Sequence, residues 1–294
     1  MPRIPQGKGR FAVSLTTLHN DKLTVTISSL GAEMQSIKDA NGIERLWQGD
    51  PKFWKSRAPI LFPIAGGLRD DCYYLDGKRY EMLKHGYVRQ IEWQLEKADD
   101  VSATYLMQEK APGFPFDYAL HVNYRLEDNR VIVTWQVDNK DSRTFYFGMG
   151  AHEGYATPDG LENYEIVFDE EETLLNHELH GNLIDPVGQV MAENTRVFPL
   201  KEKYFAVDAL VFTDLKSRGV TLVSKKHDRK VRVDFPEHDV LMFWMKPGAE
   251  YICIEPWLNA PDTLDSDMQI EHKKGCIRLE AGQSVQRHHF ITIL

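Results

Sequence analysis

Apolar and polar residues alternate over long stretches of this chain, and this period of two constrains the fold more than any other feature. In RVIVTWQVDN, residues 130–139, every second residue from Val131 to Val137 is apolar. YALHVNYRL, residues 118–126, repeats the pattern from Leu120. Alternation over such lengths is typical of β-strands that bury one face.

Further strand candidates and turn signals extend this pattern along the chain. Asp76-Gly77 predicts a tight hairpin, and Asp128-Asn129 separates two strand candidates. The other strand candidates are KLTVTISSL, GVTLVS, KVRVDF and HHFITIL. Helical patterns are scarce, and DPKFWKS and ETLLNHELHG are expected to be short helices or loops. Many strands at short spacing predict an all-β antiparallel sandwich in one domain over residues 1–294, while periodicity alone leaves a barrel or a propeller open.

Charge and cysteine content exclude several classes of protein. The net charge of -9 and the lack of a long basic run argue against nucleic acid or an anionic membrane as partner. No run approaches 18 apolar residues, and the start, MPRIPQGKGRF, has no apolar signal region. Cys72, Cys253 and Cys276 are odd in number and widely spaced, which indicates a reducing compartment. We therefore expect a cytoplasmic protein.

A carboxylate stands at the end of a strand-like apolar run. In YICIEPW, residues 251–257, Glu255 follows Ile, Cys and Ile. Proline cannot donate to a sheet ladder, so Pro256 predicts the end of the strand or an edge strand. Glu255 would then lie at a strand mouth, with Trp257 near enough to wall a pocket.

Two histidines and one arginine stand in segments with several glycines. His85 lies in KHGYVRQIEW, His152 lies in GMGAHEGYATP, and Arg69 follows Gly66-Gly67. Small neighbours leave room for a ligand beside His152, and glycines allow the backbone to approach a ligand closely. The alternatives are a structural or surface role for His85 and a solvated Arg69.

No metal site is expected. The pair His177 and His180 has no third ligand at a recognised spacing.

These segments together resemble the aldose 1-epimerase (galactose mutarotase) superfamily, and most closely its LacX-like branch. The resemblance covers most of the chain and depends on five ordered matches. The matching segments are ISSLGAEMQSIKD, APILFPIAGGLRDDCYYLDGKRYEMLKHGYVR, GAHEGY, VDALVFTDL, and YICIEPW followed by APD. The resemblance implies a large antiparallel β-supersandwich, in agreement with the alternation.

The resemblance also implies a reaction and its residues. The family interconverts the α and β anomers of an aldohexose by opening the ring, rotating about the C1–C2 bond and closing the ring again. It implies Glu255 as the base at the O1 hydroxyl, His152 as the acid at the ring O5, and His85 as a hydrogen-bonding residue. Asp208 matches a carboxylate that binds sugar hydroxyls. An imidazolium beside a carboxylate suits these roles, since each charge favours the other. No cofactor or metal is implied.

Two departures from the family pattern affect these assignments. The LacX-like branch usually has an arginine where this chain has Gly67, so Arg69 or Arg57 is expected to supply the guanidinium. The segment after the acid is commonly HPAF, whereas here it is HEGY. The additional carboxylate, Glu153, would raise the pKa of His152, change substrate choice, or point to solvent.

Three other functions stay open at this point. A hexose 6-phosphate is an alternative substrate, with Arg89 as a phosphate ligand because bidentate arginine suits phosphate. A non-catalytic sugar sensor is the second alternative. The third is a glycoside hydrolase that uses Asp208 and Glu255 as paired carboxylates. The expected partner is a small sugar, and the protein itself is expected to be a monomer or a homodimer.

Overall fold

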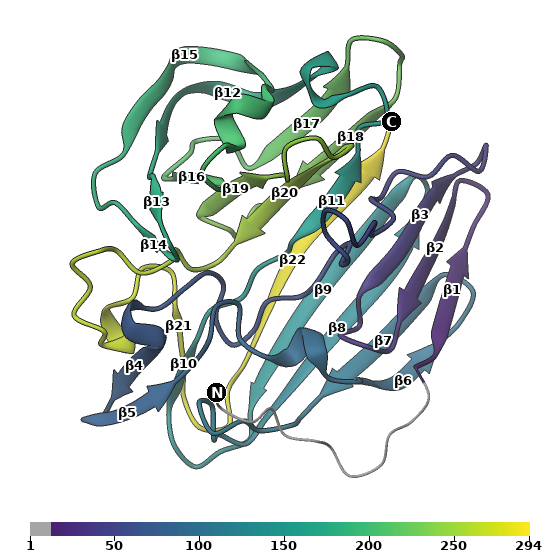
Figure 1. The fold of residues 1–294 in the computed structure, drawn as a ribbon. Helices are drawn as coiled ribbons and strands as arrows, with labels where there is room; N and C mark the ends of the chain where they lie inside the picture. Colours follow the sequence, from purple (N-terminus) through teal and green to yellow (C-terminus); the bar gives the residue numbers. More distant parts are fainter. Residues whose placement is uncertain (1–12) are drawn as a thin grey trace.

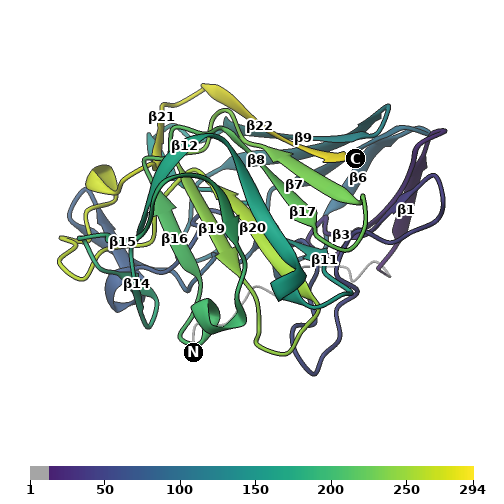
Figure 2. The same cartoon turned by 90° about the horizontal axis from the view of Figure 1, so that it is seen from above.

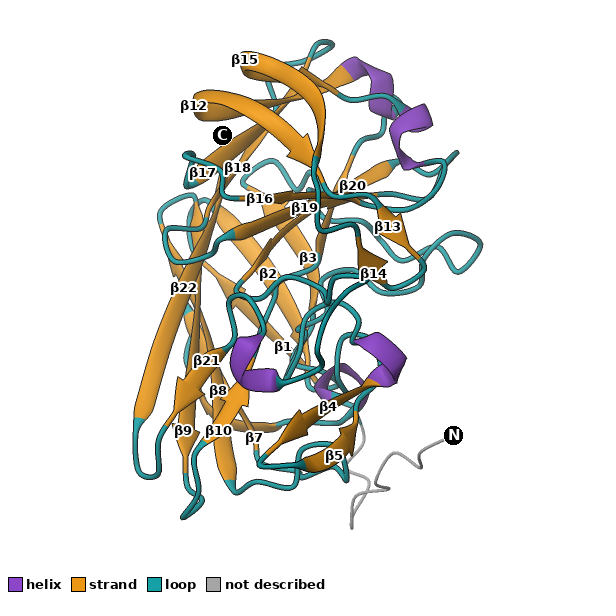
Figure 3. Cartoon of the chain, turned by 90° about the vertical axis from the view of Figure 1, so that its left-hand side faces the viewer, coloured by secondary structure: helices purple, strands orange, loops and turns teal. Residues whose placement is uncertain are grey.

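Residues 13–294 are described by a computed structural model, and Figures 1 and 3 show that strands make up most of it. The expectation about a signal peptide concerns residues 1–11 and therefore lies outside the described residues. The helices found in residues 13–294 are single 3₁₀ turns: η1 Arg69–Asp71, η2 Val88–Gln90, η3 Leu161–Asn163, η4 Glu202–Phe205 and η5 Ile270–His272. No helix in the described part is long and apolar enough to cross a bilayer.

One antiparallel sheet joins most of the strands, in the order β11-β20-β19-β16-β12-β17-β18-β22-β9-β8-β7-β6, with β15 paired to β12. Its strands are β6 Gln94–Ala98, β7 Ser102–Met107, β8 Tyr118–Glu127, β9 Arg130–Asn139, β11 Glu153–Ala156, β12 Tyr164–Asn176, β15 Gln189–Pro199, β16 Leu210–Thr213, β17 Gly219–Ser224, β18 Lys230–Asp234, β19 Val240–Trp244, β20 Tyr251–Trp257 and β22 Ser284–Ile293. Seen from above, β16, β19 and β20 lie side by side (Figure 2). The predicted antiparallel all-β class is confirmed.

Smaller sheets complete the fold. They consist of β1 Leu15–His19, β2 Leu23–Ser28 and β3 Met34–Asp39; β4 Cys72–Leu75 and β5 Lys78–Glu81; β10 Phe145–Phe147 and β21 Ile277–Leu279; and β13 Leu179–His180 and β14 Leu183–Ile184. The sheet β1–β3 lies against β7 and β8 (Figure 1), where the Tyr124 hydroxyl donates to the Ala32 carbonyl. A second layer over the long strands is what allows their apolar face to be buried.

The alternating segments are strands with the predicted faces. On β9, Val131, Val133, Trp135 and Val137 are each at most 2% exposed, and β8 shows the same alternation. The predicted hairpin is also present: β4 and β5 pair around Asp76-Gly77, and both turn residues have positive φ, as a type I′ turn requires.

One of the two segments expected to be short helices or loops differs from that expectation. ETLLNHELHG continues β12 as a strand up to Asn176 and then forms β13, because Glu172 and Leu174 alternate into the interior. The Glu172 carboxylate accepts a hydrogen bond from the Ser217 backbone, which compensates its burial. DPKFWKS contains turns and bends and no helix, which confirms the loop alternative of its prediction. The single domain over residues 1–294 stays a prediction, which the sheet running from β6 to β22 supports.

Candidate active site

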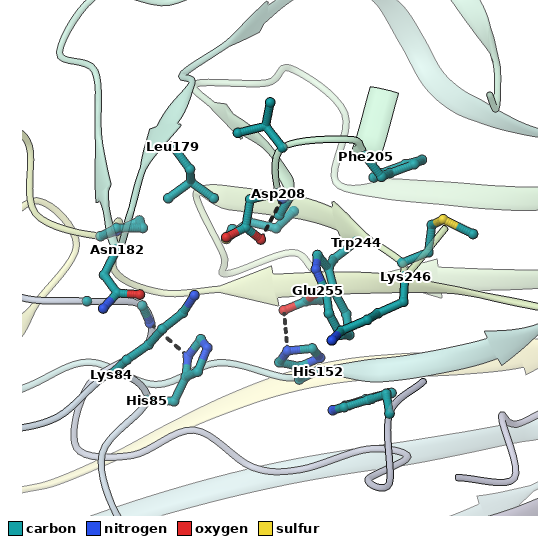
Figure 4. A pocket seen from close by; sticks show the side chains of 18 of the residues that line it. Lys84, His85, His152, Leu179, Asn182, Phe205, Asp208, Trp244, Lys246 and Glu255 are labelled. Carbon is teal, nitrogen blue, oxygen red and sulfur yellow. Dashed lines mark hydrogen bonds and ion pairs between the residues drawn. The ribbon is translucent and has the colours of Figure 1, made fainter. Parts of the chain in front are cut away.

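A pocket of about 500 Å³ lies beside β11, β19 and β20, and segments far apart in the chain line it. Figure 4 shows Glu255 and His152 facing each other at its centre, with Asp208 above them. Lys84 and His85 lie on one side and Lys246 on the other. The aromatic lining residues are Trp54, Phe205, Trp244 and Trp257. A few polar groups among aromatic walls are the usual composition of a small-molecule site.

Glu255 is held on a strand that is paired on both sides. It lies opposite Met242 of β19, and Ile254 beside it pairs with Glu153 of β11. The strand end predicted at Pro256 is confirmed to within one residue, since β20 ends at Trp257, whereas the edge alternative is wrong, since β20 lies between two strands. The proline lacks only a donor, and its carbonyl still accepts a hydrogen bond from the Ala151 amide.

His152 precedes β11 and places its ring against the carboxylate of Glu255. The Nε2 atom of His152 lies 3.5 Å from Oε2 of Glu255. The Trp54 ring stacks on the imidazole at 5.0 Å between centroids, and the Trp244 ring approaches it edge-on at 5.6 Å. Two indoles therefore fix the orientation of the imidazole at the pocket floor.

His85 has a defined tautomer. The Gly66 amide donates a hydrogen bond to Nδ1 of His85 over 3.1 Å, so Nδ1 is unprotonated and Nε2 carries the hydrogen. The reason for the neighbouring glycine is steric. A side chain at Gly86, where φ is +64°, would place Cβ 2.0 Å from the Phe62 carbonyl oxygen. His85 therefore enters the pocket as a neutral hydrogen-bond donor.

Burial disfavours charge on all three groups at the pocket floor. It raises the pKa of Glu255 well above its usual value, and Asp208 and Glu153 add to the rise while Lys84 opposes it. Burial also lowers the pKa of His152 to about 3, with Arg89 and Lys84 adding to the fall. Desolvation likewise holds the pKa of His85 well below its usual range. Burial therefore disfavours the expected ion pair between Glu255 and His152.

Three cations line the pocket, and two of them were not anticipated. Arg89 was expected there, whereas Lys84 and Lys246 were not named, although Lys84 directly precedes His85 in the sequence. Among residues 13–294, no carboxylate lies within ion-pair distance of any of the three. Asp208, two residues before β16, lines the pocket as expected, and its carboxylate accepts a hydrogen bond from the Ala209 amide.

Arg57 and Arg69 do not line the pocket. The Arg57 guanidinium donates to the Gln35 side chain and the Gln48 carbonyl. The Arg69 guanidinium donates to the Ser266 carbonyl. The expectation that Arg57 or Arg69 binds the substrate is therefore wrong, because both guanidinium groups are hydrogen-bonded outside the pocket.

The backbone of the β13–β14 turn occupies the space that a side chain at position 67 would need. A Cβ atom on Gly67 would lie 2.5 Å from Cβ of Asn182 and 2.6 Å from its carbonyl oxygen. Asn182 and Leu179 form this wall of the pocket (Figure 4). Gly67 is thus required by close packing, and the missing arginine is not replaced by a guanidinium from a neighbouring residue.

Glu153, the departure from the family pattern that directly follows His152, points away from the pocket. Its carboxylate lies 3.0 Å from Nε2 of His289, and the two residues are 3% and 0% exposed. The alternative that Glu153 points to solvent is therefore wrong, and its effect on substrate choice stays a prediction. A raised pKa of His152 is also absent, since that pKa is lowered.

Donor atoms for a metal come together at one place in the described chain. His152, Cys253 and Glu255 bring nitrogen, sulfur and oxygen atoms within 4.8 Å of one another. The histidines noted in the sequence do not form such a group: His177 is hydrogen-bonded to the Asp185 carbonyl and to Thr213. The absence of a required metal stays a prediction.

The chain matches the family model described as Aldose 1-epimerase over residues 14–291. The chain belongs to the aldose 1-epimerase family. The plasmid LacX protein of Lactococcus lactis subsp. lactis is 32% identical, and the alignment covers 94% of this chain and 98% of that protein. The resemblance inferred from the five sequence segments is thereby confirmed, and so is the predicted class of activity, an isomerase that acts on sugar anomers.

Solved structures agree with the family assignment. A galactose mutarotase related enzyme from Lactobacillus acidophilus is 30% identical, with a TM-score of 0.90 over 96% of this chain and 97% of that one. A galactose mutarotase-like protein from Lactobacillus casei ATCC 334 is 27% identical, with a TM-score of 0.89 over 96% of this chain and 100% of that one. The predicted supersandwich is therefore confirmed as the fold of an aldose 1-epimerase.

We expect the Glu153–His289 pair to contribute to stability as a coupled unit. Glu153→Ala leaves a buried imidazole without its partner and should lower the free energy of unfolding by about 1–3 kcal/mol. Urea denaturation of both single variants and the double variant measures the coupling, with the exposed Glu162→Ala as control. Additive losses in the double variant would show that the two side chains act independently.

Proposed function

We propose that this protein interconverts the α and β anomers of an aldohexose, with Glu255 as base and His152 as acid. One observation carries the proposal: Oε2 of Glu255 and Nε2 of His152 lie 3.5 Å apart on the floor of a pocket of about 500 Å³. A pyranose has two reacting oxygens on one carbon, O1 and O5, and a close acid–base pair can serve both. Proton transfer by such groups contributes typically about 10²–10⁴-fold to the rate.

The proposed reaction keeps one proton within the pair. Glu255 takes the proton from the O1 hydroxyl, the electron pair forms the C1–O1 double bond, and the C1–O5 bond breaks. His152 gives its proton to O5 as that bond breaks. After rotation about C1–C2, the protonated Glu255 returns a proton to O1 while His152 takes one from O5. The closed ring and both side chains then regain their starting states.

The bound sugar has to favour the ionised Glu255 and the protonated His152, since burial disfavours both charged forms. A hydroxyl that donates to the Glu255 carboxylate favours its ionised form, and Lys84 acts in the same direction. His85, with its hydrogen on Nε2, is suited to donate to a sugar oxygen beside the reacting carbon. Asp208 is suited to accept hydrogen bonds from other hydroxyls, and the indole of Trp244 provides an apolar surface for the C–H face of the ring.

A phosphorylated sugar is the second candidate substrate. The pocket carries Lys84, Arg89 and Lys246 without ion-pair partners, although the chain as a whole has a net charge of -9. Unpaired cations in an acidic protein attract an anionic ligand and add charge-assisted hydrogen bonds. A hexose 6-phosphate would therefore gain affinity in this pocket that a free hexose lacks.

Glu255→Gln should lower the rate of anomer exchange at least about 100-fold, because the amide has a similar shape but cannot take up the O1 proton. Exchange is measured by NMR with glucose, galactose and their 6-phosphates. Glu250→Gln, which alters an exposed glutamate just before β20, is the control and should match the wild type. Equal rates in Glu255→Gln and wild type would remove Glu255 from the mechanism, and binding without exchange in the wild type would favour a sensor.

The pH profile of kcat/KM should be a broad bell. Activity is lost at low pH when the singly protonated pair gains a second proton. Because the pKa of His152 is about 3, the acid limb of the profile should lie well below the pH range in which histidines usually titrate. Activity is lost at high pH when the pair loses its proton, and the raised pKa of Glu255 extends that limb upward. Lys84→Met removes a positive charge, so both limbs should move to higher pH. Exposed Lys97→Met is the control, and unshifted limbs in Lys84→Met would contradict this assignment.

Lys246→Met should separate the two substrate candidates. Loss of one charge-assisted contact is expected to raise KM for a hexose 6-phosphate about tenfold, and KM for the free hexose should stay unchanged. Initial rates with both sugars give the two constants. If Lys246→Met leaves the ratio of the two KM values unaltered, the ammonium of Lys246 does not bind phosphate.

A further inference from the structure

The donor group beneath the pocket holds a side chain that sugar chemistry does not use. Cys253 precedes Glu255 by two residues on β20, so both side chains lie on one face of the strand. Its sulfur lies within 4.8 Å of a ring nitrogen of His152 and a carboxylate oxygen of Glu255. We propose that these three side chains form an inhibitory binding site for a thiophilic divalent cation such as Zn²⁺.

Two of the donor residues have polar atoms without a hydrogen-bond partner. Oε2 of Glu255 lacks one although the side chain is 1% exposed, since its 3.5 Å contact with His152 does not have hydrogen-bond geometry. Nδ1 of His152 is likewise buried and unpaired. Burying such groups without a partner costs free energy. A cation bound to Oε2 would compensate the cost at the carboxylate.

The donor set selects the kind of metal. One sulfur, one imidazole nitrogen and one carboxylate oxygen match the ligands of tetrahedral Zn²⁺, whereas Mg²⁺ and Ca²⁺ require more oxygens. His152 and Glu255 line the pocket and Cys253 does not, so a fourth position would open toward the pocket. A water molecule or a sugar hydroxyl fits that position.

Occupation of the site is incompatible with anomer exchange. The imidazole and the carboxylate that would bind the cation are the groups that the proposed reaction uses as acid and base. A metal-bound imidazole is a poorer proton donor and acceptor, and a metal-bound carboxylate is a weak base. Binding releases the thiol proton of Cys253 and the proton shared by the pair, so affinity should rise with pH. The inhibition rests on the proposed function, but cation binding itself does not.

Cobalt and zinc titrations test the site in HEPES buffer. Co²⁺ should give the wild type a thiolate-to-metal charge-transfer band, and Zn²⁺ should inhibit exchange until EDTA is added. Mg²⁺ should have no effect. Cys253→Ala should lack the band and need at least about tenfold more Zn²⁺ for half inhibition, which corresponds to about 1.4 kcal/mol. Its exchange rate without metal should equal that of the wild type, and Cys276→Ala should behave as the wild type throughout.

Two results would overturn the proposal. The first is a wild type that shows neither the Co²⁺ charge-transfer band nor inhibition by Zn²⁺. The second is a Cys253→Ala variant in which the band and the Zn²⁺ concentration for half inhibition equal those of the wild type. Cys253→Ser preserves the side-chain volume and decides the question if the alanine variant does not fold, as judged by circular dichroism. If the protein exchanges no sugar, the Co²⁺ band still reports on the site, so failure of the proposed function and failure of the metal site remain distinguishable.

Discussion

Glu255 lies on a strand that is hydrogen-bonded to β11 and to β19, and this arrangement determines the chemistry of the pocket. A carboxylate on a loop would be hydrated and would keep an ordinary pKa. On β20 the side chain is 1% exposed, and burial raises its pKa. The same sheet brings His152 to 3.5 Å, so one proton can be shared at little structural cost. Two groups whose pKa values are pushed apart by burial form the acid and base of many enzymes.

Loops next to the sheet orient the imidazole rings of His152 and His85 in the pocket. The segment DPKFWKS contains no helix, yet it places Trp54 over the His152 ring, and the Trp47 indole donates to the Trp54 carbonyl. The turn before η2 places His85 against the Gly66 amide, which fixes the tautomer. Orientation by stacking and by a backbone hydrogen bond suits a pair of groups that must exchange a proton without moving far.

The fold and the central residues of the site were predictable from sequence, whereas the pocket wall was not. Alternation in β8 and β9 depends only on local spacing, and the five ordered segments named Glu255, His152, His85 and Asp208. Lys84, Lys246 and Asn182 depend on how loops far apart in the chain meet, and no local pattern reports that. The prediction that Arg57 or Arg69 binds the substrate was wrong for the same reason. Arg57 and Arg69 are near pocket residues in sequence, but their guanidinium groups bind carbonyl and amide oxygens elsewhere.

The two buried carboxylates beside His152, Glu153 and Glu255, have opposite environments. Glu153 follows His152 directly, but strand alternation turns it to the other face of β11, where His289 binds it. Glu255 remains without a hydrogen-bond partner for Oε2. A buried carboxylate that is satisfied contributes to structure, and one that is unsatisfied retains free energy that binding can release. Glu153 and Glu255 therefore differ because their side chains lie on opposite faces of the paired strands β11 and β20. Only Glu255 faces the pocket, where a sugar, a proton or a cation can reach it.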